Sequence, residues 1–166
     1  MLCKLHEQVV AKSKLQLSLH GGYVMRIEVT DTPCKEDEAF VIAQTRKYNS
    51  AFAENDHKSL CVFARDEVGN IIGGLTGRTY WQYLDIAFLW VDEKYRGEGY
   101  ATKLMKAAEA EARERGCERV FLDTLSFQAL GFYLKLGYAE FGRLPGFSSK
   151  YDRHYLHKRL DAMEHV

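Results

Sequence analysis

The sequence predicts an α/β domain in which helices flank a mixed, mostly antiparallel sheet. Three apolar runs, Leu60–Arg65, Ile71–Thr79 and Tyr83–Val91, follow one another with turn residues between them, which is typical of antiparallel strands. A helical pattern from Ala101 then leads to a short apolar run, Val120–Leu122. Because a strand, a crossover helix and a strand usually make a parallel pair, we expect these last two strands to run parallel.

Composition limits the classes of partner. The chain has 166 residues, 46% of them hydrophobic, and only two prolines, as expected for one compact domain. Lys+Arg and Asp+Glu number 23 each, so no net charge draws the protein to nucleic acid or to a membrane. The four cysteines are far apart and form no Cys-x-x-Cys pair, and no apolar run is long enough to span a bilayer. We therefore expect a cytoplasmic, reduced and metal-free protein.

The first part of the chain reads as an extension before the domain. We assign residues 1–24 to an N-terminal extension and residues 25–166 to the domain, because the first convincing strand is Arg26–Val29. The extension is expected to be an extended start or linker; the alternative is a short helix that packs on the domain or mediates dimerisation. A helix is predicted over Glu36–Asn49, followed by an irregular segment over Ser50–Ser59.

Two further helices are predicted in the second half. The first begins near Ala101 and ends before Gly116, which occupies the position of a C′ glycine. The second is expected to be capped by Ser126 and to end at Gly137. Strands are predicted over Tyr138–Phe141 and His154–Leu160, with a turn at Pro145-Gly146 between them.

The segment from Val91 to Ala101 has the pattern of a phosphate-binding turn. A strand that ends at Val91 and a helix that begins near Gly99 leave backbone N–H groups without intrahelical partners, and the helix dipole favours an anion there. Gly97 and Gly99 allow close approach of a ligand, and Arg96 adds a charged donor. The alternative is a tight strand-to-helix connection without a ligand.

Spacing distinguishes this turn from the common nucleotide motifs. The Walker pattern requires Gly-Lys-Ser/Thr, and the dinucleotide fingerprint requires a third Gly where this chain has Thr102. The order Arg96-x-x-Gly99-x-Ala101 instead resembles the acyl-CoA signature of the GNAT family of N-acyltransferases. A second motif of that family is matched over residues 126–138, except that Ser replaces the family's Asn: Ser126, Ala129, Phe132, Tyr133, Gly137 and Tyr138.

The resemblance implies a GNAT-like sheet that splays apart at an acyl-CoA site. The pantetheine arm of acetyl-CoA would lie between the strands ending at Val91 and Asp123 and would bond to the backbone of Leu89 and Val91. The residues implied around the pyrophosphate are Arg96, Gly97, Glu98, Gly99, Tyr100, Ala101 and Thr102, with Glu98 contributing only its backbone N–H. Ser126 and Phe132 complete the expected cofactor-binding set.

Two residues are candidates for proton transfer. Tyr133 matches the family's usual proton donor to the departing thiolate; the alternative is an aromatic residue of the core. Asp85 would accept the proton of the attacking amine, directly or through water, because its position matches a catalytic Glu of some histone-acetylating members. It shares a face with Val91 only if no bulge intervenes. The alternative for Asp85 is a structural carboxylate paired with Arg or Lys.

These features together predict an N-acetyltransferase. It would move an acetyl group from acetyl-CoA to an amine of a small molecule or peptide by direct attack in a ternary complex, since the sequence contains no nucleophile motif such as Gly-x-Ser-x-Gly. The main alternative is a catalytically silent acyl-CoA sensor, and a weaker one is a regulatory domain that binds nucleotide phosphate. The oligomeric state is left open, with a homodimer as one alternative.

Overall fold

The computed structural model describes residues 14–20, 23–147 and 150–160 of the chain. Its contacts divide the chain into two units, Met1–Phe52 and Ala53–Val166. This division by contacts differs from the boundary predicted after residue 24, which separates an extension from a functional domain. That boundary stays a prediction.

The first unit contains a β-hairpin and one helix. Strand β1, Lys14–His20, pairs antiparallel with β2, Tyr23–Val29. The segment expected to be an extended start or linker is therefore a paired strand over residues 14–20, and residues 1–13 lie outside the described part of the chain. Helix α1, Lys35–Asn49, agrees with the predicted helix, with acidic side chains in its first turn and basic ones in its last.

The second unit is a six-stranded sheet with helices, and it carries every candidate site residue. The strand order is β3-β4-β5-β6-β8-β7, and only the β5–β6 pair is parallel, as the sequence predicts. Its elements are β3 Lys58–Arg65, β4 Ile71–Tyr80, β5 Tyr83–Val91, the 3₁₀ turn η1 Glu93–Tyr95, α2 Tyr100–Glu114, β6 Arg119–Leu125, α3 Leu130–Lys135, β7 Ala139–Phe147 and β8 Tyr151–Arg159.

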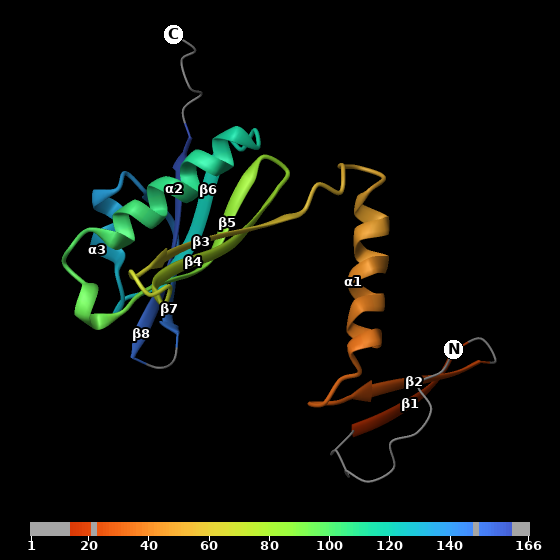
Figure 1. Cartoon of the computed structure of the whole chain (residues 1–166). Coiled ribbons are helices and arrows are strands. Elements are labelled where there is room, and N and C mark those ends of the chain that lie inside the picture. The colour runs from red at the N-terminus through yellow and green to blue at the C-terminus, as the bar shows by residue number, and fades with distance from the viewer. Residues whose placement is uncertain (1–13, 21–22, 148–149, 161–166) are drawn as a thin grey trace. The chain divides into compact units, whose positions relative to one another are not determined.

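The core lies between the sheet and the two helices. Helix α2 lies across one face of the sheet with α3 beside it (Figure 1). The apolar stripe of α2 that the sequence predicts is buried: Leu104, Met105, Ala108 and Ala112. It packs on alternate residues of the strands, which include Leu75, Leu84, Val120 and Leu156. Burial of these side chains holds α2 on the sheet, because each fully buried aliphatic side chain contributes about 1.5–3 kcal/mol.

A buried carboxylate ties helix α2 to strand β8 and to the residue that precedes β7. Glu109 on α2 is only 3% exposed, and it accepts hydrogen bonds from the Tyr138 hydroxyl at 2.9 Å and from the Lys158 ammonium at 2.8 and 3.0 Å. Burial, followed by the charge of Glu109, raises the pKa of Tyr138 well above its usual range. The phenol therefore stays neutral and remains a donor to Glu109.

Strand β5 contains a bulge at Ala87. Gly77 pairs with Ile86 and Thr76 pairs with Phe88, so one residue of β5 has no opposite partner. A Cβ atom at Gly77 would overlap the carbonyl oxygen of Asp85, so the strands approach each other here at a distance that only glycine allows. The bulge reverses the alternation of side chains between the two ends of β5.

Because of the bulge, Asp85 and Val91 do not lie on the same face of β5, although the sequence had led us to expect it. Leu84 and Ile86 lie in the core on one side of the bulge, while Leu89 and Val91 pack against the same core on the other. Asp85 therefore faces away from the helices, and it does not share a face with Val91. The condition attached to the sequence prediction, an uninterrupted period of two, does not hold.

Two residues or residue pairs that were predicted to mark the end of an element lie elsewhere in the structure. Helix α3 begins at Leu130 with Ala129 at its N-cap, and Ser126 instead accepts a hydrogen bond from the backbone N–H of Asp152 at 3.2 Å. Pro145 and Gly146 lie inside β7, at an irregularity in its pairing with β8, so the turn to β8 comes later. In both places a cross-strand partner from β8 outweighs the local signal.

Candidate active site

A groove opens where the two parallel strands separate. The β5–β6 pairing runs from Tyr83↔Arg119 to Ile86↔Leu122 and then stops, although β5 continues to Val91 and β6 to Leu125. The groove has a volume of about 700 Å³ and is lined by Ile86, Ala87, Phe88, Leu89, Trp90, Val91, Arg96, Ala101, Leu122, Asp123, Thr124, Phe127, Gln128, Ala129, Phe132 and Tyr133. Along this stretch the inner edge of β5 has no partner strand within the described residues, so its backbone groups are available to an extended ligand.

One end of the groove meets the turn that the sequence marks as a phosphate site. The N–H of Asp92 donates to Ile72 at 2.9 Å and its side chain accepts from the N–H of Lys94 at 2.9 Å, which fixes the path of the chain as it leaves β5. Gly97 and Gly99 then adopt positive φ angles of 84° and 81°, in the left-handed region that favours glycine. Helix α2 begins directly afterwards, at Tyr100.

This turn fits a pyrophosphate on geometric grounds. A Cβ atom at either glycine would meet nothing within 4 Å, so both sites are open toward solvent and toward an incoming ligand. The backbone N–H of Lys103 donates to the carbonyl of Gly99 at 3.0 Å, and the N–H groups that precede it in the helix have no intrahelical partner. Arg96 donates through Nε to the carbonyl of Val91 at 3.1 Å, so the cation is held beside the same opening. Free N–H groups, the helix dipole and a guanidinium all favour an anion.

Tyr133 is positioned by α3 at the groove wall. Its side chain is 7% exposed and packs against the rings of Phe132 and Tyr138. Burial, and then the negative charge of Asp123, raise the pKa of Tyr133 above its ordinary value of 10.0. The hydroxyl is therefore a neutral hydrogen-bond donor throughout the neutral range.

Asp123 is a groove residue that the sequence reasoning did not select. It lies just beyond the last β5–β6 pair, and both of its carboxylate oxygens accept hydrogen bonds from Arg153, at 2.7 Å each. Its position at the carboxyl end of a buried parallel strand could have identified it as a site residue, because ligands bind at that end of sheets with parallel strands. From the sequence alone, Asp123 is only the end of a predicted strand.

Asp85 lies outside the set of residues that line the groove. Its carboxylate accepts from Arg78 Nε at 3.0 Å and is 2.9 Å from a second guanidinium nitrogen of the same residue. This arrangement matches the structural alternative considered for Asp85. Its catalytic role stays a prediction.

The structure brings together part of the predicted cofactor set. Leu89, Val91, Arg96, Ala101 and Phe132 line the groove with Tyr133. Gly97, Glu98, Gly99 and Tyr100 form the adjoining turn and helix start, and Thr102 follows in the first turn of α2. Ser126 is not among the lining residues. Gln128 lines the groove instead, and its side-chain oxygen accepts from Leu125 N–H at 2.8 Å and from the Thr124 hydroxyl at 3.2 Å.

Within the described residues, no three His, Cys, Asp or Glu side chains gather in a way that would hold a metal ion. In the same part of the chain, no helix combines the length and the hydropathy needed to cross a bilayer.

Comparison with known proteins agrees with this geometry. The sequence profile of the acetyltransferase (GNAT) family matches residues 23–138. An acetyltransferase of Agrobacterium fabrum is 35% identical over 137 residues, which cover 82% of this chain and 100% of the relative. The blasticidin-S acetyltransferase of Streptomyces morookaense is 40% identical over 99 residues, covering 59% of this chain and 73% of the relative. The crystal structure of an acetyltransferase from Agrobacterium tumefaciens superposes with a TM-score of 0.77 at 35% identity, over 81% of this chain and 99% of that one.

The fold, the splayed groove and the glycine turn thus define an acyltransferase of the acyl-CoA-dependent class. The chain belongs to the GNAT family of acetyltransferases, whose members are acyl-CoA-dependent N-acetyltransferases.

We expect Gly99→Val to weaken acetyl-CoA binding by about ten-fold or more, which is at least about 1.4 kcal/mol. The branched side chain disfavours the positive φ of 81° and fills space where the backbone would approach the pyrophosphate. Isothermal titration calorimetry measures the effect. Gly69→Val is the matched control, because Gly69 has a positive φ of 91° and open surroundings in the turn between β3 and β4. Equal affinity in both variants would place the pyrophosphate elsewhere.

Proposed function

We propose that this chain transfers an acetyl group from acetyl-CoA to the amine of a small molecule, by direct attack in a ternary complex. The observation that carries the proposal is the continuous groove that leads from Arg96 and Ala101, beside the glycine turn, to Tyr133 and Asp123. Acetyl-CoA would supply an activated acetyl group as a thioester. To bind such a ligand and transfer its acetyl group, a protein needs an anion site for the pyrophosphate and a channel for the pantetheine arm. It also needs polar groups at the end of the channel where the thioester lies.

The residues at the polar end have separate tasks in this proposal. The nitrogen of the acceptor forms a new bond to the acetyl carbon as the carbon–sulfur bond breaks. A carboxylate or a water takes the proton that the amine must lose, since a lysine-like ammonium has a pKa of about 10.4 and cannot attack. Tyr133 donates a hydrogen bond to the sulfur as negative charge develops on it. Because the pKa of Tyr133 is raised, a hydrogen bond is favoured over complete proton transfer.

Aromatic side chains at the groove support a small acceptor with an apolar or planar body. Phe88, Trp90 and Phe127 line the groove, and each is well exposed to solvent. Phe127 contacts Tyr151 with ring centroids 4.6 Å apart, which extends the aromatic surface beyond the groove lining. Such surfaces bind planar or apolar groups. The similarity to a blasticidin-S acetyltransferase is consistent with a small-molecule acceptor.

A transfer assay tests the function directly. The purified chain is incubated with acetyl-CoA and a panel of amines, and products are detected by mass spectrometry. The panel contains nucleoside amines, aminoglycosides, polyamines, amino acids and peptide N-termini. We expect acetylated product with at least one small-molecule amine. Binding of acetyl-CoA without any product would favour the sensor alternative, and transfer to peptides alone would move the acceptor class to peptides.

Tyr133→Phe should lower kcat by about ten- to a thousand-fold while changing acetyl-CoA affinity by less than about three-fold. The phenyl ring keeps the packing against Phe132 and Tyr138, so only the hydroxyl is lost. Steady-state kinetics with an amine from the panel, together with calorimetry, separate the two effects. Because the pKa is raised above about 10, the hydroxyl stays protonated in the neutral range. Wild-type kcat in this variant would reduce Tyr133 to a packing residue.

The proton acceptor is tested by the pH profile of kcat/KM for the amine. Asp123→Asn and Asp85→Asn each remove one candidate carboxylate. Both carboxylates are paired with an arginine, but Asp123 lines the groove and Asp85 does not. We therefore expect the acidic limb of the profile to change in Asp123→Asn and to persist in Asp85→Asn. Loss of the limb in Asp85→Asn alone would support the role predicted from the sequence. If the acidic limb of the pH profile is unchanged in both variants, water rather than either carboxylate accepts the proton of the amine.

A further inference from the structure

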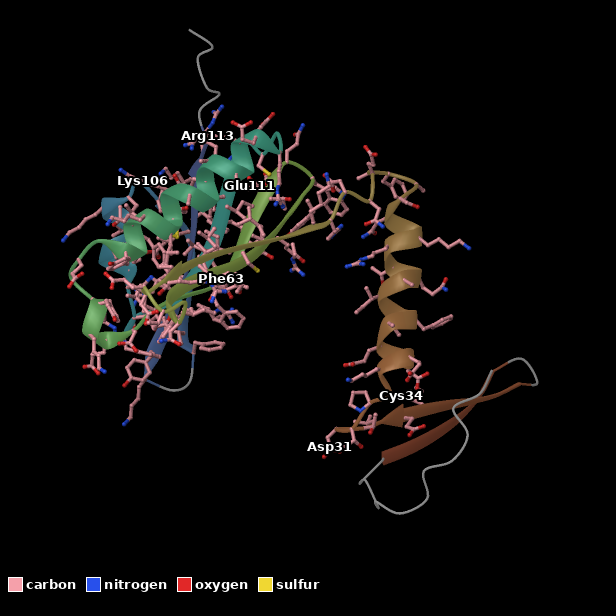
Figure 2. All side chains as sticks on the ribbon, viewed as in Figure 1. Asp31, Cys34, Phe63, Lys106, Glu111 and Arg113 are labelled. Atoms are coloured by element: carbon pink, nitrogen blue, oxygen red, sulfur yellow. The ribbon has the colours of Figure 1, made fainter. Side chains whose placement is uncertain are left out.

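A second hollow, of about 500 Å³, lies on the face of the sheet that is turned away from the helices. Strand β6 places Val120 and Leu122 in the core, so Phe121 between them faces the other side. Figure 2 marks the two sides of the sheet, with Lys106 on α2 and Phe63 on the opposite side. The size of the hollow is that of a pocket for a small molecule. Its aromatic lining residues are Tyr80, Trp81, Tyr83, Phe121 and Phe141.

Two polar side chains, Arg119 and His157, complete the lining of this hollow. The side chain of Arg119 is half-buried and forms no ion pair or hydrogen bond with the residues that the structure describes. Asp85, which lies opposite Phe121 in the β5–β6 ladder, is paired with Arg78 instead. The Nδ1 atom of His157 is buried and has no hydrogen-bond partner in the same part of the chain, which is a rare and costly arrangement. The hollow therefore combines aromatic walls with an unpaired cation and an unsatisfied ring nitrogen.

The turn between β4 and β5, which forms one wall of the hollow, is held in place by several contacts. Trp81 has a positive φ of 49°, a conformation that residues other than glycine rarely adopt. Its N–H donates to the two carboxylate oxygens of Asp56 at 3.0 and 3.1 Å, and its indole Nε1 donates to the carbonyl of Glu54 at 2.9 Å. Tyr80 is stacked on the ring of His57, with centroids 4.7 Å apart. Because this wall is already ordered, little conformational entropy is lost when a ligand packs against it.

We propose that this hollow binds a planar aromatic carboxylate, with Arg119 as the partner of the carboxylate group. The planar fork of a guanidinium matches the two oxygens of a carboxylate, and the aromatic lining packs against a ring. Aromatic faces also attract cations, but the unpaired charge of Arg119 repels a cation and therefore selects an anion. The hollow shares no lining residue with the groove of the candidate active site. The inference is thus independent of the proposed use of acetyl-CoA.

The test compares indole-3-acetate with its uncharged analogue indole-3-acetamide by calorimetry on the full chain. We expect the wild type to bind indole-3-acetate at least about ten-fold more tightly, since the amide loses the charge-assisted hydrogen bonds to Arg119. Arg119→Gln should weaken binding of indole-3-acetate by about ten-fold and that of indole-3-acetamide by less than about two-fold. Arg65→Gln is the matched control, because it changes the net charge equally and Arg65 is an exposed residue at the end of β3 that does not line the hollow. Phe121→Leu should weaken both probes alike, by roughly two- to ten-fold, because it removes only the ring.

The outcomes separate this inference from the proposed function. Absence of indole-3-acetate binding at millimolar concentration, or equal affinity of the wild type for both probes, would overturn the site. An equal loss in Arg119→Gln and Arg65→Gln would also overturn it, because it would show a general effect of charge. An excess of acetyl-CoA should leave the affinity for indole-3-acetate unchanged, whereas competition would move the probe to the groove and overturn the site. A wild-type preference for indole-3-acetate that only Arg119→Gln abolishes would establish it, whether or not the chain transfers an acetyl group.

Discussion

The site depends on the short length of one parallel strand pair. In a sheet that is otherwise antiparallel, β5 and β6 pair over four residue pairs, and their separation beyond Ile86 and Leu122 creates the groove. Each strand remains paired on its outer side, β5 with β4 and β6 with β8, so the separation does not unravel the sheet. Beyond Ile86 the inner edge of β5 has no partner strand among the residues that the structure describes. Because buried backbone groups need partners, a groove of this kind favours a ligand that offers its own amides.

The helix layer positions the predicted phosphate turn relative to that groove. Helix α2 is held by its buried apolar stripe and by Glu109, which joins it to Tyr138 and to Lys158 of β8. Its N-terminus is thereby fixed beside the end of β5, where the glycine turn supplies free N–H groups. One buried carboxylate thus fixes the helix to two separate parts of the chain.

Burial of Tyr133 also sets its chemistry. The environment that holds the ring rigid against Phe132 and Tyr138 raises the pKa of the hydroxyl, and Asp123 raises it further. A phenol of this kind is a poor source of a complete proton and a good hydrogen-bond donor in a low-dielectric site. Stabilisation of developing charge on sulfur is therefore the role that suits it.

The sequence by itself determined the elements with strong local patterns: the amphipathic helix α2, the hairpin of β3 and β4, the strand before Val91 and the two glycines of the phosphate turn. These depend on periodicity and on φ angles, which neighbouring residues decide. Only the tertiary structure decided the features that depend on a partner from elsewhere in the chain. Pairing with Gly77 produced the bulge that turned Asp85 away from the helices, and pairing with β8 drew Ser126 from its expected cap. Asp123 became a groove residue because β5 and β6 separate just before it, and no local pattern records where two distant strands stop pairing.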